Sequence, residues 1–192
     1  MFRTIVIAVA VAGLGASAPA QMTQFCRPGV DVGVMLCPCA NPPVSPALGC
    51  NNFGQFTGGA TLDASGVPAT DTVTLHVTGA NLFALVIFLQ SRGVTPPTGV
   101  QFAAGVRCLS IGSGSFFKRM YTGIAHAGMI DRPGPGDLSI MVRSASPPGP
   151  IDVIIPGSTR YYFAFYRDPN AAAPCGNTAL TFNCSNSGSI LW

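Results

Sequence analysis

Four cysteines stand close together near the start of the chain, in a segment where proline recurs every few residues. They are Cys26, Cys37, Cys39 and Cys50. Proline has no backbone N–H to donate to a neighbouring strand, so this segment is poorly suited to a sheet interior. Disulfides can hold such a segment where a hydrophobic core cannot. We therefore expect residues 21–55 to form a Cys/Pro-rich segment stapled by disulfides.

The spacing of these cysteines excludes one disulfide but does not determine which cysteines pair. Cys37 and Cys39 are separated only by Pro38, and a disulfide between them would close a strained ring. We expect each to reach a different partner, with Cys26 and Cys50 the nearest in sequence. That gives two disulfides inside the segment, and spacing alone does not determine their connectivity.

Residues 1–20 have the features of a secretory signal peptide. A short start with Arg3 is followed by an apolar run over 4–14 and by the small residues Ala18 and Ala20 at a cleavage-type site. The run is shorter than the roughly 20 apolar residues that span a bilayer. We therefore expect export, cleavage after Ala20, no transmembrane segment in the mature chain, and disulfides formed in an oxidising compartment. The expected location is extracellular or the cell surface, with the periplasm as the alternative.

The composition of the chain is that of a β protein. Only 9% of the residues are charged, glutamate is absent, Lys118 is the only lysine, and there are 23 glycines and 17 prolines. Helix surfaces are usually rich in Glu and Lys, whereas turn residues between Val, Thr, Phe and Tyr favour strands. The formal net charge of +3 falls to 3 − 1 = +2 if Arg3 leaves with the signal. A charge that small does not indicate a nucleic-acid partner.

Hydrophobic periodicity from residue 56 onward predicts short strands separated by Pro/Gly turns. Apolar and polar residues alternate over 72–78, which is typical of a half-buried strand. The run 82–89 is continuously apolar and indicates a strand buried on both faces. Further strands are expected at 106–111, 138–143, 151–155, 160–167, 179–182 and 189–192. The pattern predicts an all-β fold in which residues 56–192 form a β-sandwich, for which a jelly-roll-like topology is one option.

The strand expected at 160–167 is unusually aromatic. Alternation places Tyr161, Phe163 and Phe165 on one face and Tyr162 and Tyr166 on the other. One set should enter the core, and the other could form an exposed stacking platform for a sugar or a peptide. We take Tyr162 and Tyr166 as that platform, flanked by the strand-end arginines Arg160 and Arg167. The alternative is that both faces are covered and the tyrosines only pack.

Acid–base catalysis has few candidates in this chain. A Ser-His-Asp site needs a histidine beside a hydroxyl, and only His76 and His126 exist. His76 lies on the polar face of its predicted strand and is interpreted as a solvated surface residue, so His126 is the better candidate. No Gly-x-Ser-x-Gly elbow occurs, and Ser113 and Ser115 are interpreted as turn residues. A glycosidase pair would have to come from aspartates, and Asp152 is expected to point outward from its strand.

Metal and cofactor sites are not indicated. The Cys37-Pro38-Cys39 motif has no histidine at ligand spacing. No Asp-x-Asp-x-Asp-Gly calcium loop and no glycine-rich phosphate loop followed by lysine is present. We expect no cofactor.

Several short motifs, taken in order, resemble a family of secreted bacterial β-rich proteins that has no assigned activity. The motifs are Phe25-Cys26, Cys37-Pro38-Cys39, Gly49-Cys50, Arg160-Tyr161-Tyr162 with Tyr166-Arg167-Asp168, and Phe182-Asn183 with the closing Trp192. The resemblance covers nearly all of the chain after residue 20. It implies a secreted β fold and contributes no catalytic residues.

The resemblance also has an implication for the cysteines. Six positions recur in the family pattern: Cys26, Cys37, Cys39, Cys50, Cys108 and Cys175. This implies a Cys108–Cys175 disulfide and leaves Cys184 over. A local Cys175–Cys184 disulfide, with Cys108 free, is the alternative.

Taken together, these features predict an extracellular module that acts by surface contact rather than catalysis, as a structural, adhesive or ligand-binding unit. Its partner would be an extracellular glycan or protein. The first alternative is a carbohydrate-binding module centred on Tyr162 and Tyr166. The second is an extracellular hydrolase that uses His126.

Overall fold

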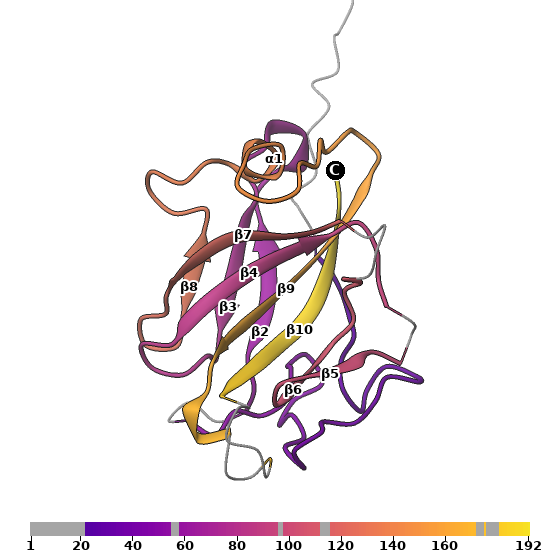
Figure 1. Ribbon diagram of the computed structural model, residues 1–192, viewed down its shortest axis with the longest axis vertical. Coiled ribbons are helices and arrows are strands. Elements are labelled where there is room, and N and C mark those ends of the chain that lie inside the picture. The colour runs from indigo at the N-terminus through magenta and orange to yellow at the C-terminus, as the bar shows by residue number, and fades with distance from the viewer. Residues whose placement is uncertain (1–21, 55–57, 96–97, 112–115, 172–174, 176–180) are drawn as a thin grey trace, which may run out of the picture.

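The protein is a β-sandwich of two antiparallel sheets, as a computed structural model shows (Figure 1). The structure describes residues 22–54, 58–95, 98–111, 116–171, 175 and 181–192. The predicted signal peptide at 1–20, Ser113 and Ser115 lie outside the described residues, as do the first two residues of the strand expected at 179–182. In Figure 1 the strands β4 and β7 cross in front of β2 and β3.

The larger, five-stranded sheet has the order β1-β10-β9-β4-β7. Its strands are β1 (Thr23–Phe25), β4 (Leu85–Ser91), β7 (Phe117–Ile124), β9 (Thr159–Arg167) and β10 (Phe182–Leu191). The smaller, three-stranded sheet has the order β2-β3-β8, with β2 (Thr61–Ser65), β3 (Thr74–Thr78) and β8 (Ile130–Arg132). A separate hairpin pairs β5 (Val100–Phe102) with β6 (Gly105–Arg107). Single 3₁₀ turns lie at η1 (Pro68–Thr70) and η2 (Pro169–Ala171).

The main core lies between the two sheets. Leu62, Leu75 and Val77 of the three-stranded sheet meet Phe88 and Tyr162 of the five-stranded sheet, and all five are 0% exposed. Removing their apolar area from water stabilises the fold by roughly 25 cal/mol per Å². Because two sheets enclose one core, the all-β sandwich predicted from the sequence is confirmed.

A second apolar layer covers the opposite face of the five-stranded sheet. Ile87, Leu89 and Phe163 point away from the main core and pack with Leu109 and with Phe102 of the β5–β6 hairpin. Strand β4 is thus buried on both faces, as predicted for the run 82–89. It begins only at Leu85, however, because residues 82 and 83 form a turn.

Two strand predictions are wrong. Residues 138–143 contain a short helix, α1 (Ile140–Ser144), which the Asp71 carboxylate holds by accepting hydrogen bonds from the Ser139 hydroxyl and, at 3.0 Å, from the Met141 N–H. Residues 151–155 form neither a strand nor a helix. There the buried Asp152 side chain anchors the segment in place of a backbone ladder.

The N-terminal segment is tied to the rest of the fold rather than only to itself. The disulfides join Cys26 to Cys108, Cys37 to Cys50 and Cys39 to Cys175, and Cys184 is free and buried. The six bridged positions, the leftover Cys184 and the different partners of Cys37 and Cys39 are confirmed. The Cys108–Cys175 pairing is wrong, and so is the expectation of two disulfides inside the segment.

The physical reason for the different pairing is the path of the N-terminal segment. Strand β1 pairs with β10, which brings Cys26 into a buried cluster with Val106 and Cys108 at the end of β6. Further along, the Asn41 side-chain amide donates to the Ala104 carbonyl at 3.1 Å. The segment therefore packs along the β5–β6 hairpin, and two of its four cysteines, Cys26 and Cys39, find partners far away in sequence.

No helix in the described residues is long and apolar enough to cross a membrane.

Candidate functional site

The two tyrosines predicted to form an exposed platform are both fully buried. Tyr162 and Tyr166 have 0% of their surface exposed, because their face of β9 is the one that meets the three-stranded sheet. Burial raises the pKa of both phenols above the ordinary value. Since neither ring reaches solvent, the stacking platform expected at these residues is wrong.

The two flanking arginines have different surroundings. Arg160 is buried and binds Asp152, with Nε to Oδ2 at 2.6 Å and Nη2 to Oδ1 at 2.9 Å. Arg167 is exposed, and its guanidinium lies 5.2 Å from the centre of the Phe182 ring while Nη1 donates to the Thr181 hydroxyl at 2.7 Å. The four residues predicted as a ligand surface are therefore not brought together as one.

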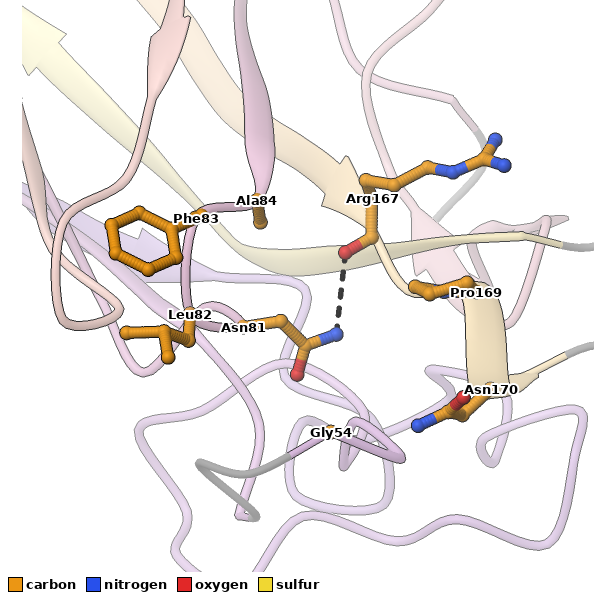
Figure 2. A pocket seen from close by; sticks show the side chains of 8 residues that line it. All are labelled: Gly54, Asn81, Leu82, Phe83, Ala84, Arg167, Pro169 and Asn170. Carbon is orange, nitrogen blue, oxygen red and sulfur yellow. Dashed lines mark hydrogen bonds between the residues drawn. The ribbon is translucent and has the colours of Figure 1, made fainter.

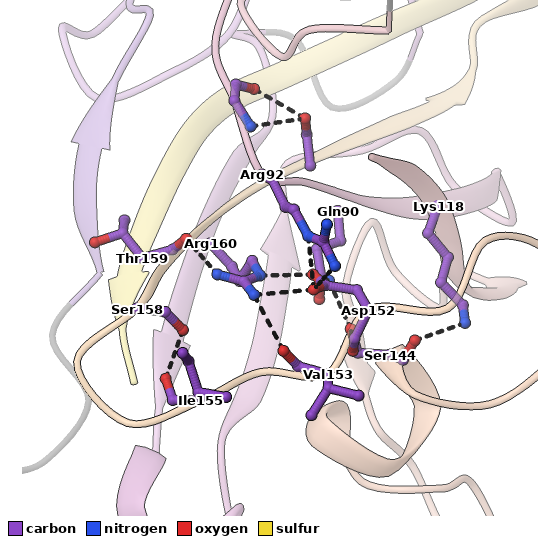
Figure 3. Close-up of polar contacts among 12 residues, drawn as sticks. Gln90, Arg92, Lys118, Ser144, Asp152, Val153, Ile155, Ser158, Thr159 and Arg160 are labelled. Carbon is purple, nitrogen blue, oxygen red and sulfur yellow. Dashed lines mark hydrogen bonds and ion pairs between the residues drawn. The ribbon is translucent and has the colours of Figure 1, made fainter. Parts of the chain in front are cut away.

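Arg160 belongs to a buried polar cluster at one end of the sandwich (Figure 3). Its centre is the carboxylate of Asp152, which also accepts from Arg92 Nε at 2.8 Å and from Gln90 Nε2 at 3.0 Å. Burial raises the pKa of Asp152, but the hydrogen bonds and charges of Arg160 and Arg92 outweigh it and leave that pKa below its ordinary value. The expectation that Asp152 points outward is wrong.

Lys118, the single lysine, lies at the edge of the same cluster. Its ammonium donates to the carbonyls of Ser144, at 2.9 Å, and Ser146. Burial lowers the pKa of Lys118. With every charge bound to carbonyls or to Asp152, this cluster anchors the segment between α1 and β9 and offers no reactive group.

His126, the predicted catalytic histidine, lies at the tight turn between β7 and β8. The next two residues, Ala127 and Gly128, both have positive φ, as two-residue hairpin turns require. The exposed imidazole contacts the Phe83 ring edge-on, with 5.9 Å between the ring centres. Within the described residues no hydroxyl or carboxylate hydrogen-bonds to this ring, so no catalytic partner lies in place beside it.

His76, in contrast, has two polar partners on the outer face of the three-stranded sheet. Its Nε2 lies 2.7 Å from the Ser65 hydroxyl, and its Nδ1 lies 2.7 Å from Asp131 Oδ1. The alternating pattern of its strand correctly predicted that His76 lies on a polar face, but it did not indicate either partner. Strand pairing brings Ser65 and Asp131 to His76. Ser65 is only eleven positions away in sequence, on the neighbouring strand β2, whereas Asp131 is fifty-five positions away.

A shallow pocket of about 370 Å3 opens where β3 leads into β4 and β9 ends. Figure 2 shows Leu82 and Phe83 on one side, Pro169 and Asn170 on the other, and Asn81 between them. Asn81 is 7% exposed, whereas Phe83 is 63% exposed. The pocket thus combines a buried amide with a solvent-facing aromatic ring.

The Asn81 amide is held in place by its nitrogen. Nδ2 donates to the Arg167 carbonyl at 3.2 Å and to Asp168 Oδ1 at 3.0 Å. Its Oδ1 is buried and has no hydrogen-bond partner. Figure 2 shows this oxygen turned toward Gly54, where a Cβ would lie only 1.6 Å from it. Buried polar atoms normally have a partner, so this oxygen is an unsatisfied acceptor in the wall of the pocket.

Phe83 is held in an unusual backbone conformation. Its φ is +53°, which is rare for a bulky residue and costs about 1–3 kcal/mol. The conformation turns the ring out of the fold at the loop apex, beside the pocket. Strain of this kind persists where the surrounding structure enforces it, often at binding sites.

The described part of the chain holds no group of three or more His, Cys, Asp or Glu side chains that could bind a metal ion. Comparisons with protein families, curated proteins and solved structures found no match to this chain.

Proposed function

We propose that this chain is a secreted binding module that takes a neutral, hydroxyl-bearing ligand, a sugar, in the pocket at Asn81. The observation that carries the proposal is the buried, unpartnered Asn81 Oδ1 beside the exposed Phe83 ring. Sugars offer hydroxyl donors on their edges and apolar C–H faces that pack on aromatic rings. Pockets of this kind combine apolar walls with a few fixed polar groups that orient the ligand.

The charges around the pocket support a neutral ligand. Asp168 is buried, and its carboxylate accepts from the Phe53 N–H at 3.1 Å and from Asn81 and Asn183. The Arg167 guanidinium points away from the pocket in Figure 2. Neither charge is therefore directed at the ligand, and the recognising groups are a neutral oxygen and a ring.

The three disulfides support an oxidising compartment, which agrees with secretion through a signal peptide at 1–20. The sandwich supplies a rigid frame for the loops at its end, where β3–β4 and the end of β9 lie together. Membership of the secreted bacterial β-rich family is part of the same proposal.

The test is a titration of the isotope-labelled protein with methyl β-glucoside and methyl α-mannoside, followed by NMR. Binding at the proposed pocket should shift the Asn81 side-chain amide and the backbone amides of Phe83 and Asn170. The Leu191 amide, at the exposed end of β10, serves as the reference that should not move. Shifts confined to residues outside the pocket would contradict the proposal.

A further inference from the structure

A serine, a histidine and an aspartate are hydrogen-bonded in series on the outer face of the three-stranded sheet. Ser65 Oγ lies 2.7 Å from His76 Nε2, and His76 Nδ1 lies 2.7 Å from Asp131 Oδ1. We propose that Ser65 is an activated nucleophile that reacts with small, activated carboxylic esters. This activity goes beyond ligand binding, because the Asn81 pocket contains none of the three residues.

Strand order explains why these three side chains meet. β3 is the central strand of its sheet, with β2 on one side and β8 on the other. Alternation directs Leu75 and Val77 into the core, so His76 between them faces outward. His76 pairs in register with Asp131 on β8, and Ser65 lies diagonally across on β2. Direct and diagonal neighbours on one face of a sheet are within reach of an imidazole.

The hydrogen-bond pattern sets the direction of proton transfer. An ionised carboxylate only accepts hydrogen bonds, so the proton shared with Asp131 sits on Nδ1 of His76. Nε2 then has a lone pair and accepts the hydrogen bond of the Ser65 hydroxyl. This is the arrangement in which a serine-histidine-aspartate series makes a hydroxyl nucleophilic.

The reaction is balanced with water as the only co-reactant. Ser65 Oγ bonds to the ester carbonyl carbon while its proton passes to His76 Nε2. The C–O bond to the leaving alcohol then breaks, and His76 returns the proton to that oxygen, leaving an acyl-Ser65 ester. Water attacks this ester with His76 taking its proton, and the products are a carboxylic acid and the restored Ser65.

The exposure of the site determines which esters will react with Ser65. Ser65 and Asp131 are exposed, and the Asp131 side chain is 66% exposed. An oxyanion formed there is solvated by water instead of by enclosed donors, and one such donor is worth about 10²–10³ in rate. We therefore expect Ser65 to be acylated slowly, and only by esters that have good leaving groups.

The first experiment uses a fluorophosphonate probe, whose phosphorus bonds to Oγ as fluoride leaves with the serine proton. Intact mass and peptide mapping should find the label on Ser65, at least tenfold faster than on the exposed Ser45. His76→Ala should lower the labelling rate at least tenfold, and His126→Ala should leave it unchanged. The absence of a label on Ser65, or a rate that His76→Ala does not change, would overturn the proposal.

The second experiment uses p-nitrophenyl acetate, because an imidazole can itself attack this ester. Release of p-nitrophenolate above the buffer rate should disappear in Ser65→Ala. Release that persists in that variant would come from another nucleophile, such as the imidazole of His76 or of the exposed His126, and would contradict the role of Ser65.

Asp131 acts through His76 and is a positioning residue. Asp131→Asn should lower the labelling rate, because the amide can present a donor to Nδ1 and favour the wrong tautomer. Asp131→Glu keeps the carboxylate and should restore much of the rate. The melting temperatures of the two Asp131 variants should stay near that of the wild type. A labelling rate that falls with the melting temperature, whether or not a carboxylate is present at position 131, would contradict this role.

Discussion

Arg160 holds the carboxylate of Asp152 through two hydrogen bonds, Nε to Oδ2 at 2.6 Å and Nη2 to Oδ1 at 2.9 Å. Both residues are buried, and Arg92 adds an ion pair to the same carboxylate at 2.7 Å. Two arginines thus depend on one acid, at the point where the chain returns from α1 to β9. Removing that acid leaves a buried guanidinium without its counter-charge.

Asp152→Asn should therefore lower the free energy of unfolding by about 3–5 kcal/mol, the cost of breaking a buried ion pair from one side. Urea denaturation followed by fluorescence measures this change. Asp63→Asn, at an exposed aspartate, is the matched control and should change stability by no more than about 0.5 kcal/mol. A loss at Asp152 as small as at Asp63 would contradict the anchoring role.

The same carboxylate predicts how stability depends on pH. The pKa of Asp152 is lowered by folding, so its contribution is fully present above the unfolded value of about 3.9 and is lost as the pH falls through the folded pKa. The wild type should lose stability on acidification below about pH 4 more steeply than Asp152→Asn. The difference in free energy of unfolding between the wild type and Asp152→Asn should therefore narrow as the pH falls. A difference that does not change with pH would contradict this prediction.

The long-range disulfides should contribute more stability than the local one. Cys39 and Cys175 are separated by 136 residues, and Cys37 and Cys50 by 13. The chain-entropy argument gives about 5 kcal/mol for the longer loop and about 3 kcal/mol for the shorter. Thermal unfolding of the two double Cys→Ser variants should show the larger loss without Cys39–Cys175; the reverse order would contradict the pairing.

Cys184 should be inert in the folded protein. Burial raises the pKa of its thiol, so the reactive thiolate is scarce at neutral pH. Iodoacetamide should leave the native protein unmodified and add one label per chain, at Cys184, in denaturant without reductant. Modification of the native protein at the denatured rate, or a second free thiol, would be inconsistent with the structure.

Local sequence patterns predicted the parts of this fold that depend on neighbours in the chain. Apolar periodicity identified β3, β4 and β9 and the two faces of β9. Periodicity does not indicate which other elements pack on each face of β9. The prediction that Tyr162 and Tyr166 face solvent is therefore wrong, because the three-stranded sheet covers them. The opposite face, with Phe163, is covered as well, by the β5–β6 hairpin.

Features set by distant partners could not be predicted in this way. The α1 helix depends on Asp71, about seventy positions earlier, and the Cys26–Cys108 disulfide on the pairing of β1 with β10. The Ser65–His76–Asp131 series needs the register of three strands. The Asn81 pocket needs an oxygen without a partner, which is a property of the packed structure and not of the sequence.

The most direct test of the binding function is a glycan microarray probed with four proteins: the wild type, Phe83→Ala, Gly54→Ala and the exposed control Leu191→Ala. The wild type and Leu191→Ala should bind at least one neutral glycan equally well. Phe83→Ala should bind it about tenfold more weakly, which corresponds to about 1.4 kcal/mol, and Gly54→Ala should also lose affinity because its Cβ displaces Asn81 Oδ1. An array on which the wild type binds no neutral glycan, or binds one with an affinity that neither pocket substitution changes, would contradict the account.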